Sequence, residues 1–396
     1  MTNDRFIPDF RFALNGSPAP AAMRACVTSV TNQNGLEGAD RVEIALVNEN
    51  LRWLDEPSLK VDNELTLCMG YAPDPLNQMF VGNIVGQTAT FPSSGVPTLT
   101  IAAQDARQRL QTGTRERWFA IPDDSCNKPM PDLAIAGMIS GENALVPSFD
   151  PIGAALSLAL TFVEADQYGD DKQKAQKAIR KQVRKSDFEF LTKLCRENGW
   201  EMLIEHDDPL GGHRITFMTP TNRLFPDVSL AYGKSLLEFS PRFSKVGQLV
   251  SVTVFIWISE LKLSLAVTVG WDWDRSALKL TVRPQTSFTS SGPSDYLVTR
   301  PLTPETAPRC IIGELIPRLN KRLTASGSAV GDPSIRAGGV MRIDGVGTQF
   351  GGLYRIVSAT HTIDAGGYRT SFDLRKEIWF GDQNLQPGAI PKLAMA

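Results

Sequence analysis

The first part of the chain alternates apolar and polar positions in the way that is typical of half-buried β-strands. In RVEIALV, Val42, Ile44 and Leu46 fall on one face and the charged residues on the other, because successive side chains of a strand point to opposite sides. The segments LTLCMGY, MFVGNIVGQTATF and TLTIAAQD continue the pattern, separated by the turns APDPLNQ and FPSSGVP. Residues 6–112 are therefore predicted to form an all-β unit of about five or more antiparallel strands.

A helical pattern replaces this alternation in the middle of the chain. Helices are predicted over 151–166 and 171–199, after a stretch at 113–150 that is rich in Pro, Gly and Asp. In SDFEFLTKLCRENG, a serine cap, a glutamate three residues later and a closing glycine are the signals of a complete helix. The turn DDPLGG between WEMLIE and HRITFM predicts a small hairpin that closes this middle unit near residue 220.

Alternation returns in the last part of the chain. VSVTVFIW has valine and isoleucine at every second position, which predicts a strand near residues 250–257. Further strands are predicted at 261–271, at 277–283 and between 340 and 374, and a helix that Pro317 kinks or divides is predicted over 305–324. Residues 223–380 are therefore predicted to form a second β-rich unit.

Two segments in these β regions share a pattern. FVGNIVGQTATFPSSGVPTLTI and FGGLYRIVSATHTIDAGGYRTSFDL both begin with Phe-x-Gly, contain a later glycine (Gly95 and Gly366) and end in alternating apolar residues. Each predicts a hairpin with a glycine-containing turn that closes an all-β unit. An internal duplication explains the likeness, and shared turn chemistry explains it as well.

Composition narrows the class of protein. The 396 residues suggest two to four structural units, and 42% hydrophobic with 21% charged residues is typical of a soluble globular protein. No apolar run is long enough to cross a bilayer, and MTNDRFIPDF has no features of a secretion signal, so cytoplasmic folding is expected. The five cysteines lie far apart and predict neither disulfides nor a zinc site, and the net charge of −2 does not favour nucleic acid or anionic membrane as a partner.

Few residues suggest chemistry. His361 lies within a predicted strand, without a serine, cysteine or carboxylate at the spacing of a triad or metal motif, so we interpret it as structural. His206, Asp207, Asp208 and His213 flank the DDPLGG turn, where they either hold a cation or reflect ordinary turn composition. The glycines of GGVMRIDGVGTQFGG indicate tight β-turns rather than a phosphate loop, because no helix pattern follows them. The sequence assigns no catalytic residue, cofactor or metal ligand.

One basic run stands out, KQKAQKAIRKQVRK. It is interpreted either as a solvated helix face or as a surface that docks on an acidic partner or lines a channel, and the absence of aromatic residues argues against a nucleic-acid module. The interface candidates in it are Lys172, Lys174, Lys177, Arg180, Lys181, Arg184 and Lys185.

The closing series GDPSIRAGGVMRIDGVGTQFGGLYRIVSATHTIDAGGYRTSFDLRK resembles the late control gene D family of phage tail proteins, the baseplate hubs of contractile tails. This family includes the hub portion of the type VI secretion spike protein VgrG and the hubs of extracellular injection systems. NENLRWLDEPSLKVDNELTLCMGY with FVGNIVGQTATFPSSGVPTLTIAAQDARQRL resembles the family's first barrel, and VRKSDFEFLTKLCRENGWEM resembles its middle-domain helix. The resemblance covers about residues 5–380.

The resemblance implies a mainly β fold with two tail-tube-like antiparallel β-barrels and a smaller α+β middle domain, assembled as a pseudo-sixfold homotrimer. The implied role is a non-enzymatic adaptor in a tail or injection particle, joining a hexameric inner tube to a trimeric spike, with other baseplate components as partners and no insertion into membranes. The expected domains are the first barrel at 1–112, the middle domain at 113–222, the second barrel at 223–380 and a tail at 381–396.

The sequence departs from fused spike proteins at its end. GDQNLQPGAIPKLAMA is too short for a further barrel and has no needle repeats, so the spike is expected to be a separate protein, with the tail around Gln386 and Pro387 as a docking strap. Two other classes remain as alternatives. A baseplate-associated peptidoglycan hydrolase requires a carboxylate pair or metal site, and a β-rich carbohydrate-binding protein is expected to be monomeric with exposed aromatic platforms.

Overall fold

The computed structural model describes most of the chain. The described residues are 7–122, 127–151, 153–155, 157–159, 161, 179–220, 223–243, 251–258, 263–272, 277–284, 295–302, 311, 313–314, 317–318, 320, 322–377 and 380. No helix within these ranges is long and apolar enough to cross a membrane.

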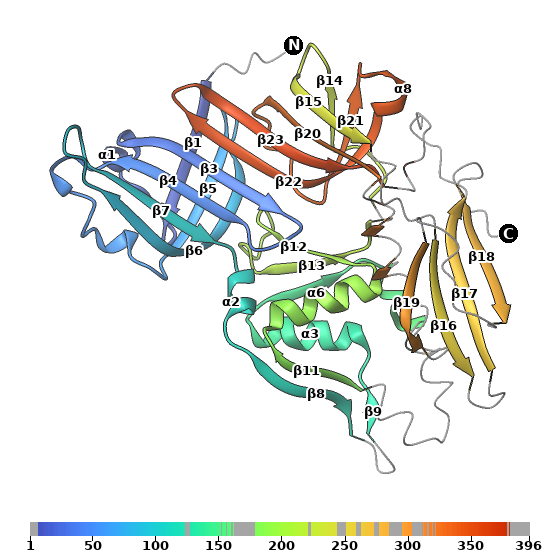
Figure 1. The fold of residues 1–396 in the computed structure, drawn as a ribbon. Helices are drawn as coiled ribbons and strands as arrows, with labels where there is room; N and C mark the ends of the chain where they lie inside the picture. The colour runs from blue at the N-terminus through green and yellow to red at the C-terminus, as the bar shows by residue number, and fades with distance from the viewer. Residues whose placement is uncertain are drawn as a thin grey trace.

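The chain divides into β-rich stretches on either side of a mixed middle region (Figure 1). The first stretch contains β1 Ile7–Leu14, β2 Ser17–Pro18, α1 Ala21–Ala25, β3 Val27–Gly35, β4 Arg41–Val47, η1 Glu49–Leu51, η2 Pro57–Leu59, β5 Glu64–Ala72, β6 Asn77–Thr90 and β7 Thr98–Gln104. The middle contains α2 Arg107–Gln111, β8 Arg115–Ile121, β9 Lys128–Pro129, α3 Asp132–Glu142, β10 Val146–Phe149, β11 Arg180–Lys185, α6 Asp187–Asn198, β12 Glu201–Glu205 and β13 Arg214–Met218. The last contains β14 Val228–Ala231, β15 Leu236–Phe243, β16 Ser251–Ile258, β17 Leu263–Asp272, β18 Ala277–Pro284, β19 Asp295–Leu302, β20 Leu323–Val330, β21 Val340–Asp344, α8 Gly347–Phe350, β22 Gly352–Asp364 and β23 Gly367–Arg375.

Most strands of the two β-rich stretches belong to one 13-stranded sheet. The chain of paired strands runs β15-β20-β23-β22-β3-β4-β7-β6-β5-β1-β2, with β21 paired to β22 and β14 to β21. The predicted strand RVEIALV is β4, and Val42, Ile44 and Leu46 are fully buried. The described strands do not close into a barrel, so the structure confirms the mainly β class and leaves the two-barrel organisation as a prediction.

The same order of strands occurs twice in this sheet. The first stretch reads β1-β5-β6-β7-β4-β3, and the last reads β14-β21-β22-β23-β20-β15. The echoed hairpins, β6–β7 and β22–β23, therefore occupy equivalent places. The first strand of each hairpin has a register shift, at Val85 in β6 and at Val357 in β22. In both hairpins a turn glycine with positive φ, Gly95 or Gly367, follows the shift after the same number of residues. The shared order favours duplication over coincident turn chemistry.

The two halves of the sheet join where β22 pairs with β3. The first β unit has its own core, to which the second unit adds Ile363 and Tyr368. The second unit buries another apolar cluster that includes Leu230, Tyr354 and Phe372. Ile363 and Tyr368 of the second unit are therefore buried in the core of the first unit, and this contact connects the two units.

The middle region lies below this sheet in Figure 1, where α3 and α6 pack among the sheets β10-β13-β12 and β11-β8-β9. The predicted capping box is present on α6: the Ser186 side chain accepts from the Glu189 N–H, and the Glu189 carboxylate accepts from the Ser186 N–H. Gly199 ends the helix at φ 69°, a conformation that glycine adopts without strain. The hairpin around DDPLGG is also present as β12 and β13.

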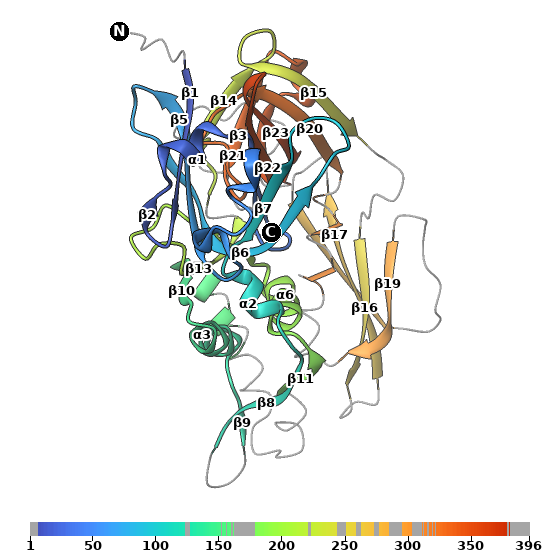
Figure 2. The same cartoon turned by 90° about the vertical axis from the view of Figure 1, so that its left-hand side faces the viewer.

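Four predictions about local structure were wrong or incomplete. Residues 180–185 form β11 instead of continuing a helix, and Leu323 begins β20 instead of ending one. The glycine-rich stretch contains the single helical turn α8. Strands β16 to β19, expected in the second β unit, form a separate four-stranded sheet, visible at one side of the molecule in Figures 1 and 2.

Candidate functional site

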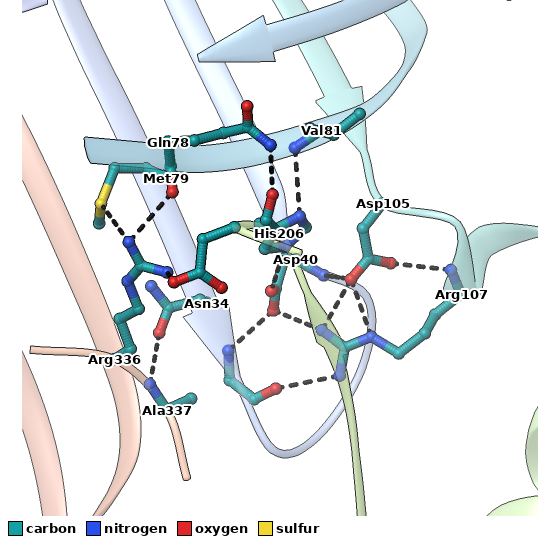
Figure 3. Close-up of polar contacts among 12 residues, drawn as sticks. Asn34, Asp40, Gln78, Met79, Val81, Asp105, Arg107, His206, Arg336 and Ala337 are labelled. Carbon is teal, nitrogen blue, oxygen red and sulfur yellow. Dashed lines mark hydrogen bonds and ion pairs between the residues drawn. The ribbon is translucent and has the colours of Figure 1, made fainter. Parts of the chain in front are cut away.

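A cluster of buried charges lies where the first β unit meets the middle region (Figure 3). Asp40 lies in the loop between β3 and β4, Asp105 directly follows β7, Arg107 begins α2 and His206 directly follows β12. Each side chain is at most 6% exposed. Two loop positions of the sheet, the first residue of α2 and one residue of the middle hairpin therefore converge on a single buried site.

Arg107 organises this cluster. Its Nε donates to Asp105 Oδ2 at 2.9 Å, and its Nη2 lies 2.5 Å from Asp40 Oδ1 and 2.8 Å from Asp105 Oδ2. Its Nη1 donates to the carbonyl oxygens of Gly35, at 3.1 Å, and Met202, at 3.4 Å. One guanidinium thus ties two loops of the β unit to strand β12.

His206 adds a second connection between the same parts. Its Nδ1 accepts from the Val81 N–H at 3.1 Å, so the ring proton lies on Nε2, which donates to Asp40 Oδ2 at 2.9 Å. The Gln78 side chain also donates to the His206 carbonyl oxygen, and the Phe80 ring lies 5.3 Å from the imidazole, centroid to centroid. These contacts place the imidazole in one orientation.

The two carboxyl groups differ in their electrostatics. Burial works to raise the pKa of Asp40, but Arg107, with hydrogen bonds from His206 and the Gly35 N–H, outweighs burial and leaves that pKa below its usual value. Burial raises the pKa of Asp105, and the charge of Asp40 adds to the rise although Arg107 opposes it. Asp40 is therefore the carboxylate that the cluster holds in its ionised form most strongly.

The same atoms have the spacing of a metal site. One ligand atom from each of Asp40, Asp105 and His206 lies within 4.8 Å of the others. However, the Arg107 guanidinium already bridges the carboxylates, and the His206 Nε2 proton points at Asp40. A metal ion would have to displace a buried cation and a ring proton. The donor set therefore fits a structural clamp better than a metal centre.

A cavity of about 770 Å³ borders the clamp and opens between three parts of the chain. Its lining includes Asp40, His206, Asp207 and residues of the loop before β21. Arg336 in that loop reaches Asp207 at 2.8 Å and donates to the Gln78 carbonyl oxygen at 3.0 Å, as Figure 3 shows for Gln78. The second β unit therefore meets the first β unit and the middle region at this cavity.

A second ionic cluster lies at the other end of β12. Arg355 and Glu377 are fully buried, with Nη2 3.0 Å from Oε2, and Arg375 donates to Glu377 Oε1 at 2.8 Å. Arg375 also pairs with Glu201, the first residue of β12. Burial raises the pKa of Glu201 although Arg375 opposes the rise. Strand β12 thus connects to the second unit at its beginning and to the first unit just after its end.

The structure describes only some of the predicted interface candidates. Lys172, Lys174, Lys177, Gln386 and Pro387 lie outside the described residues. The remaining four candidates are on β11, so the helix-face interpretation is wrong for them. Arg180 makes two 3.0 Å hydrogen bonds to Asp132 and lies 2.9 Å from Glu197, which makes it an internal contact.

Lys181, Arg184 and Lys185 remain on the surface of β11. Lys181 Nζ lies 4.6 Å from the centroid of the Trp118 ring, and Arg184 lies 3.4 Å from Glu116. Sequence reasoning missed Trp118, because the stretch 113–150 is characterised only by its Pro, Gly and Asp content and no strand is predicted in it.

The histidine interpretations have mixed outcomes. His361 is fully buried on β22, where Nε2 donates to the Ile335 carbonyl oxygen at 2.8 Å and Nδ1 accepts from Tyr368 and Thr370. This environment confirms its structural interpretation. The residues at the DDPLGG turn do not converge on one point: Asp207 pairs with Arg336, Asp208 with Arg214, and His206 with Asp40.

Comparison with known proteins supports the fold. No protein-family model matches the sequence, and none of the curated proteins is similar to it in sequence. Solved structures do match. The prophage MuSo2 43 kDa tail protein from Shewanella oneidensis superposes with a TM-score of 0.61 at 12% identity, covering 93% of this chain and 98% of that one. The tail protein from Neisseria meningitidis MC58 gives 0.57 at 10% identity, covering 95% and 98%.

A third similar structure comes from a secretion system. The E. coli c3393 protein, described as a component of the type VI secretion system with structural similarity to the T4 bacteriophage tail proteins gp27 and gp5, gives a TM-score of 0.56 at 11% identity and covers 92% of this chain and 76% of that one. The predicted resemblance is thus confirmed at the level of structure: this chain has the fold of phage tail proteins and of a type VI secretion component.

Proposed function

We propose that this protein is the structural hub of the baseplate in a contractile tail or injection system. In this role it forms a homotrimer that joins a hexameric inner tube to a trimeric spike made by a separate protein. Similarity to two tail proteins over more than nine tenths of both chains supports the proposal, as does similarity to a secretion-system component.

The repeated strand order carries the proposal furthest. Each chain contains the order β1-β5-β6-β7-β4-β3 and its counterpart β14-β21-β22-β23-β20-β15. Three such chains around an axis would present six similar β units, so the ring would have threefold symmetry in sequence and nearly sixfold symmetry in shape. An adaptor between a hexamer and a trimer requires this property.

The ionic clusters at the two ends of β12 suit such an adaptor. They hold both β units against the middle region through buried, multiply hydrogen-bonded arginines. Loss of one partner from a buried pair costs about 3–5 kcal/mol, because the other charge is left uncompensated. The relative orientation of the two units is therefore stabilised within each chain, before any trimer forms.

The expected domain division belongs to the same proposal, with β-barrels at 1–112 and 223–380, the middle domain at 113–222 and a spike-binding tail at 381–396. Deleting 381–396 tests the tail. Unchanged capture of the spike protein by the truncated chain would remove the docking-strap hypothesis.

The mass of the purified protein in solution tests the hub. Three chains of 43.4 kDa predict a particle of about 130 kDa by analytical ultracentrifugation, alone or with the neighbouring tube and spike proteins. A stable 43 kDa monomer that binds neither protein contradicts the proposal. A cell-wall turnover assay on the same sample tests the hydrolase alternative, which predicts activity that one Asp or Glu substitution abolishes.

A further inference from the structure

The ribbon of β8, β9 and β11 lies at the end of the middle region that is farthest from the 13-stranded sheet in both ribbon views (Figures 1 and 2). Strands β8 and β11 pair antiparallel, with Trp118 opposite Lys181 and Arg117 opposite Gln182. Alternate residues of the pair face the helices or the solvent. One face of the ribbon therefore packs on the helices, and the other face is exposed to solvent.

The inner face is fully used by the fold. Phe119 is 1% exposed and stacks on Phe190 of α6 at 5.1 Å between ring centroids. Arg117 donates to Asp187 at 2.7 Å, and the buried Gln182 donates to the same carboxylate at 2.9 Å. These contacts anchor the ribbon to the helices and keep it rigid.

The outer face exposes large apolar side chains to solvent. Trp118 is 71% exposed and Val183 is 52% exposed, although tryptophan contributes most when it is covered. Lys181 packs over the indole at 4.6 Å from the ring centroid, which holds the ring in one orientation by a cation–π contact. An ordered, solvent-exposed indole is a preorganised anchor for a partner.

A bulge directs further positive charge to this face. The register between β8 and β11 shifts after Gln182, and Arg184 takes a positive φ of 50°. Its side chain is 87% exposed. Bulges with such backbone strain are common where a strand aims a side chain at a function. Lys181 and Arg184 lie on the outer face with Trp118, whereas Lys185 pairs with Arg115, whose Nε lies 3.4 Å from Asp187 on the helix side. Glu116, which pairs with Arg184, is the single acidic residue in the two strands.

We propose that this outer face, defined by Trp118, Lys181, Val183 and Arg184, binds an acidic segment of a partner protein. An apolar side chain of that segment would cover Trp118 and Val183, while its carboxylates pair with the surrounding cations. The exposed valine favours a protein over a nucleic acid, because it offers an apolar contact but no ring on which a base could stack. The proposal goes beyond the hub function, because it assigns to this face a partner of stated chemistry that the hub function does not name.

Fluorescence anisotropy with labelled synthetic peptides tests the proposal on the full-length protein. The first probe alternates acidic residues with leucines, the second replaces the acids with lysines, and the third replaces the leucines with serines. We expect the first peptide to bind best and to weaken as salt rises from about 50 to about 300 mM. W118A should weaken its binding roughly tenfold or more, and K181E should weaken it and reduce its salt dependence.

Two matched variants control for general effects. F225A removes another aromatic residue that is 70% exposed, and K60E reverses another exposed lysine; neither should change peptide binding. Thermal unfolding of each variant establishes that it is folded, and K181E provides a second readout if W118A is not.

Three outcomes would overturn the proposal. The first is equal binding of the lysine and acidic peptides. The second is wild-type binding of the acidic peptide by both W118A and K181E. The third is a preference of the wild type for single-stranded DNA or peptidoglycan fragments over the acidic peptide.

Discussion

His361 makes the stability of the second β unit dependent on pH. The imidazole is fully buried on β22, with Nε2 donating to the Ile335 carbonyl oxygen at 2.8 Å and Nδ1 accepting at 3.0 Å from Tyr368. Burial lowers the pKa of His361 from 6.5 to about 4, and the hydrogen bond to Ile335 opposes this only in part. The folded protein therefore keeps the ring neutral at pH values where an unfolded chain protonates it.

The sign and size of the effect follow from proton linkage. Between pH 6.5 and about 4 the unfolded state binds a proton at this site that the folded state does not, so stability is complete above pH 6.5 and falls as the pH decreases. With 1.36 kcal/mol for each pH unit between the two pKa values, the loss approaches about 3 kcal/mol near pH 4 and below. This is a substantial part of the total stability of an ordinary domain.

Urea unfolding of the wild type and of His361→Gln, followed by circular dichroism at pH 7.5, 5.5 and 4.5, isolates this contribution. The variant is less stable at pH 7.5, because a buried hydrogen bond is lost, but the difference between the two proteins should shrink by about 2–3 kcal/mol toward pH 4.5. All other titrating groups are common to both proteins and cancel. His213→Gln is the matched control for replacing a histidine elsewhere. A difference that stays constant within about 0.5 kcal/mol over this range would refute the reasoning.

Four further substitutions test the contacts between the units and the helix signals, each by urea unfolding at pH 7.5. Arg107→Ala leaves two buried carboxylates without their cation and should cost about 3–5 kcal/mol; a loss below about 1 kcal/mol would mean that the clamp is solvated. Gly331→Ala places a methyl group against the Tyr368 ring and should cost about 1–3 kcal/mol, whereas Gly141→Ala, with open space around it in α3, should be neutral or stabilising. Ser186→Ala removes the α6 cap and should cost about 1 kcal/mol, and an unchanged midpoint would show that the cap contributes nothing.

Predictions from the sequence are correct where the residues that determine the structure lie close together in the chain. The Ser186 and Glu189 box and the Gly199 end of α6 are all set by neighbouring backbone groups, so the sequence predicts them correctly. Strand β4 is also predicted correctly, because one of its faces packs on apolar neighbours and its apolar and polar residues therefore alternate with period two.

Such predictions fail where buried polar groups replace apolar ones. In β11 the inward positions are Arg180 and Gln182, which bind carboxylates of α3 and α6, so the strand has no hydrophobic alternation and was assigned to a helix. The buried cluster of Asp40, Asp105, Arg107 and His206 could not be predicted from the sequence either. Its members Asp40 and His206 are 166 residues apart in sequence, and no local pattern links them.

The pairing of β15 with β20 has a consequence for how this fold varies. Phe243 and Leu323 are direct cross-strand partners, so the chain leaves the sheet at one residue and returns at its neighbour, about 5 Å away. In the first unit the equivalent step, from β3 to β4, takes only residues 36–40. The gap between Phe243 and Leu323 is therefore short enough for a turn of the kind that joins β3 to β4, and the pairing of β15 with β20 does not require a connection as long as 244–322.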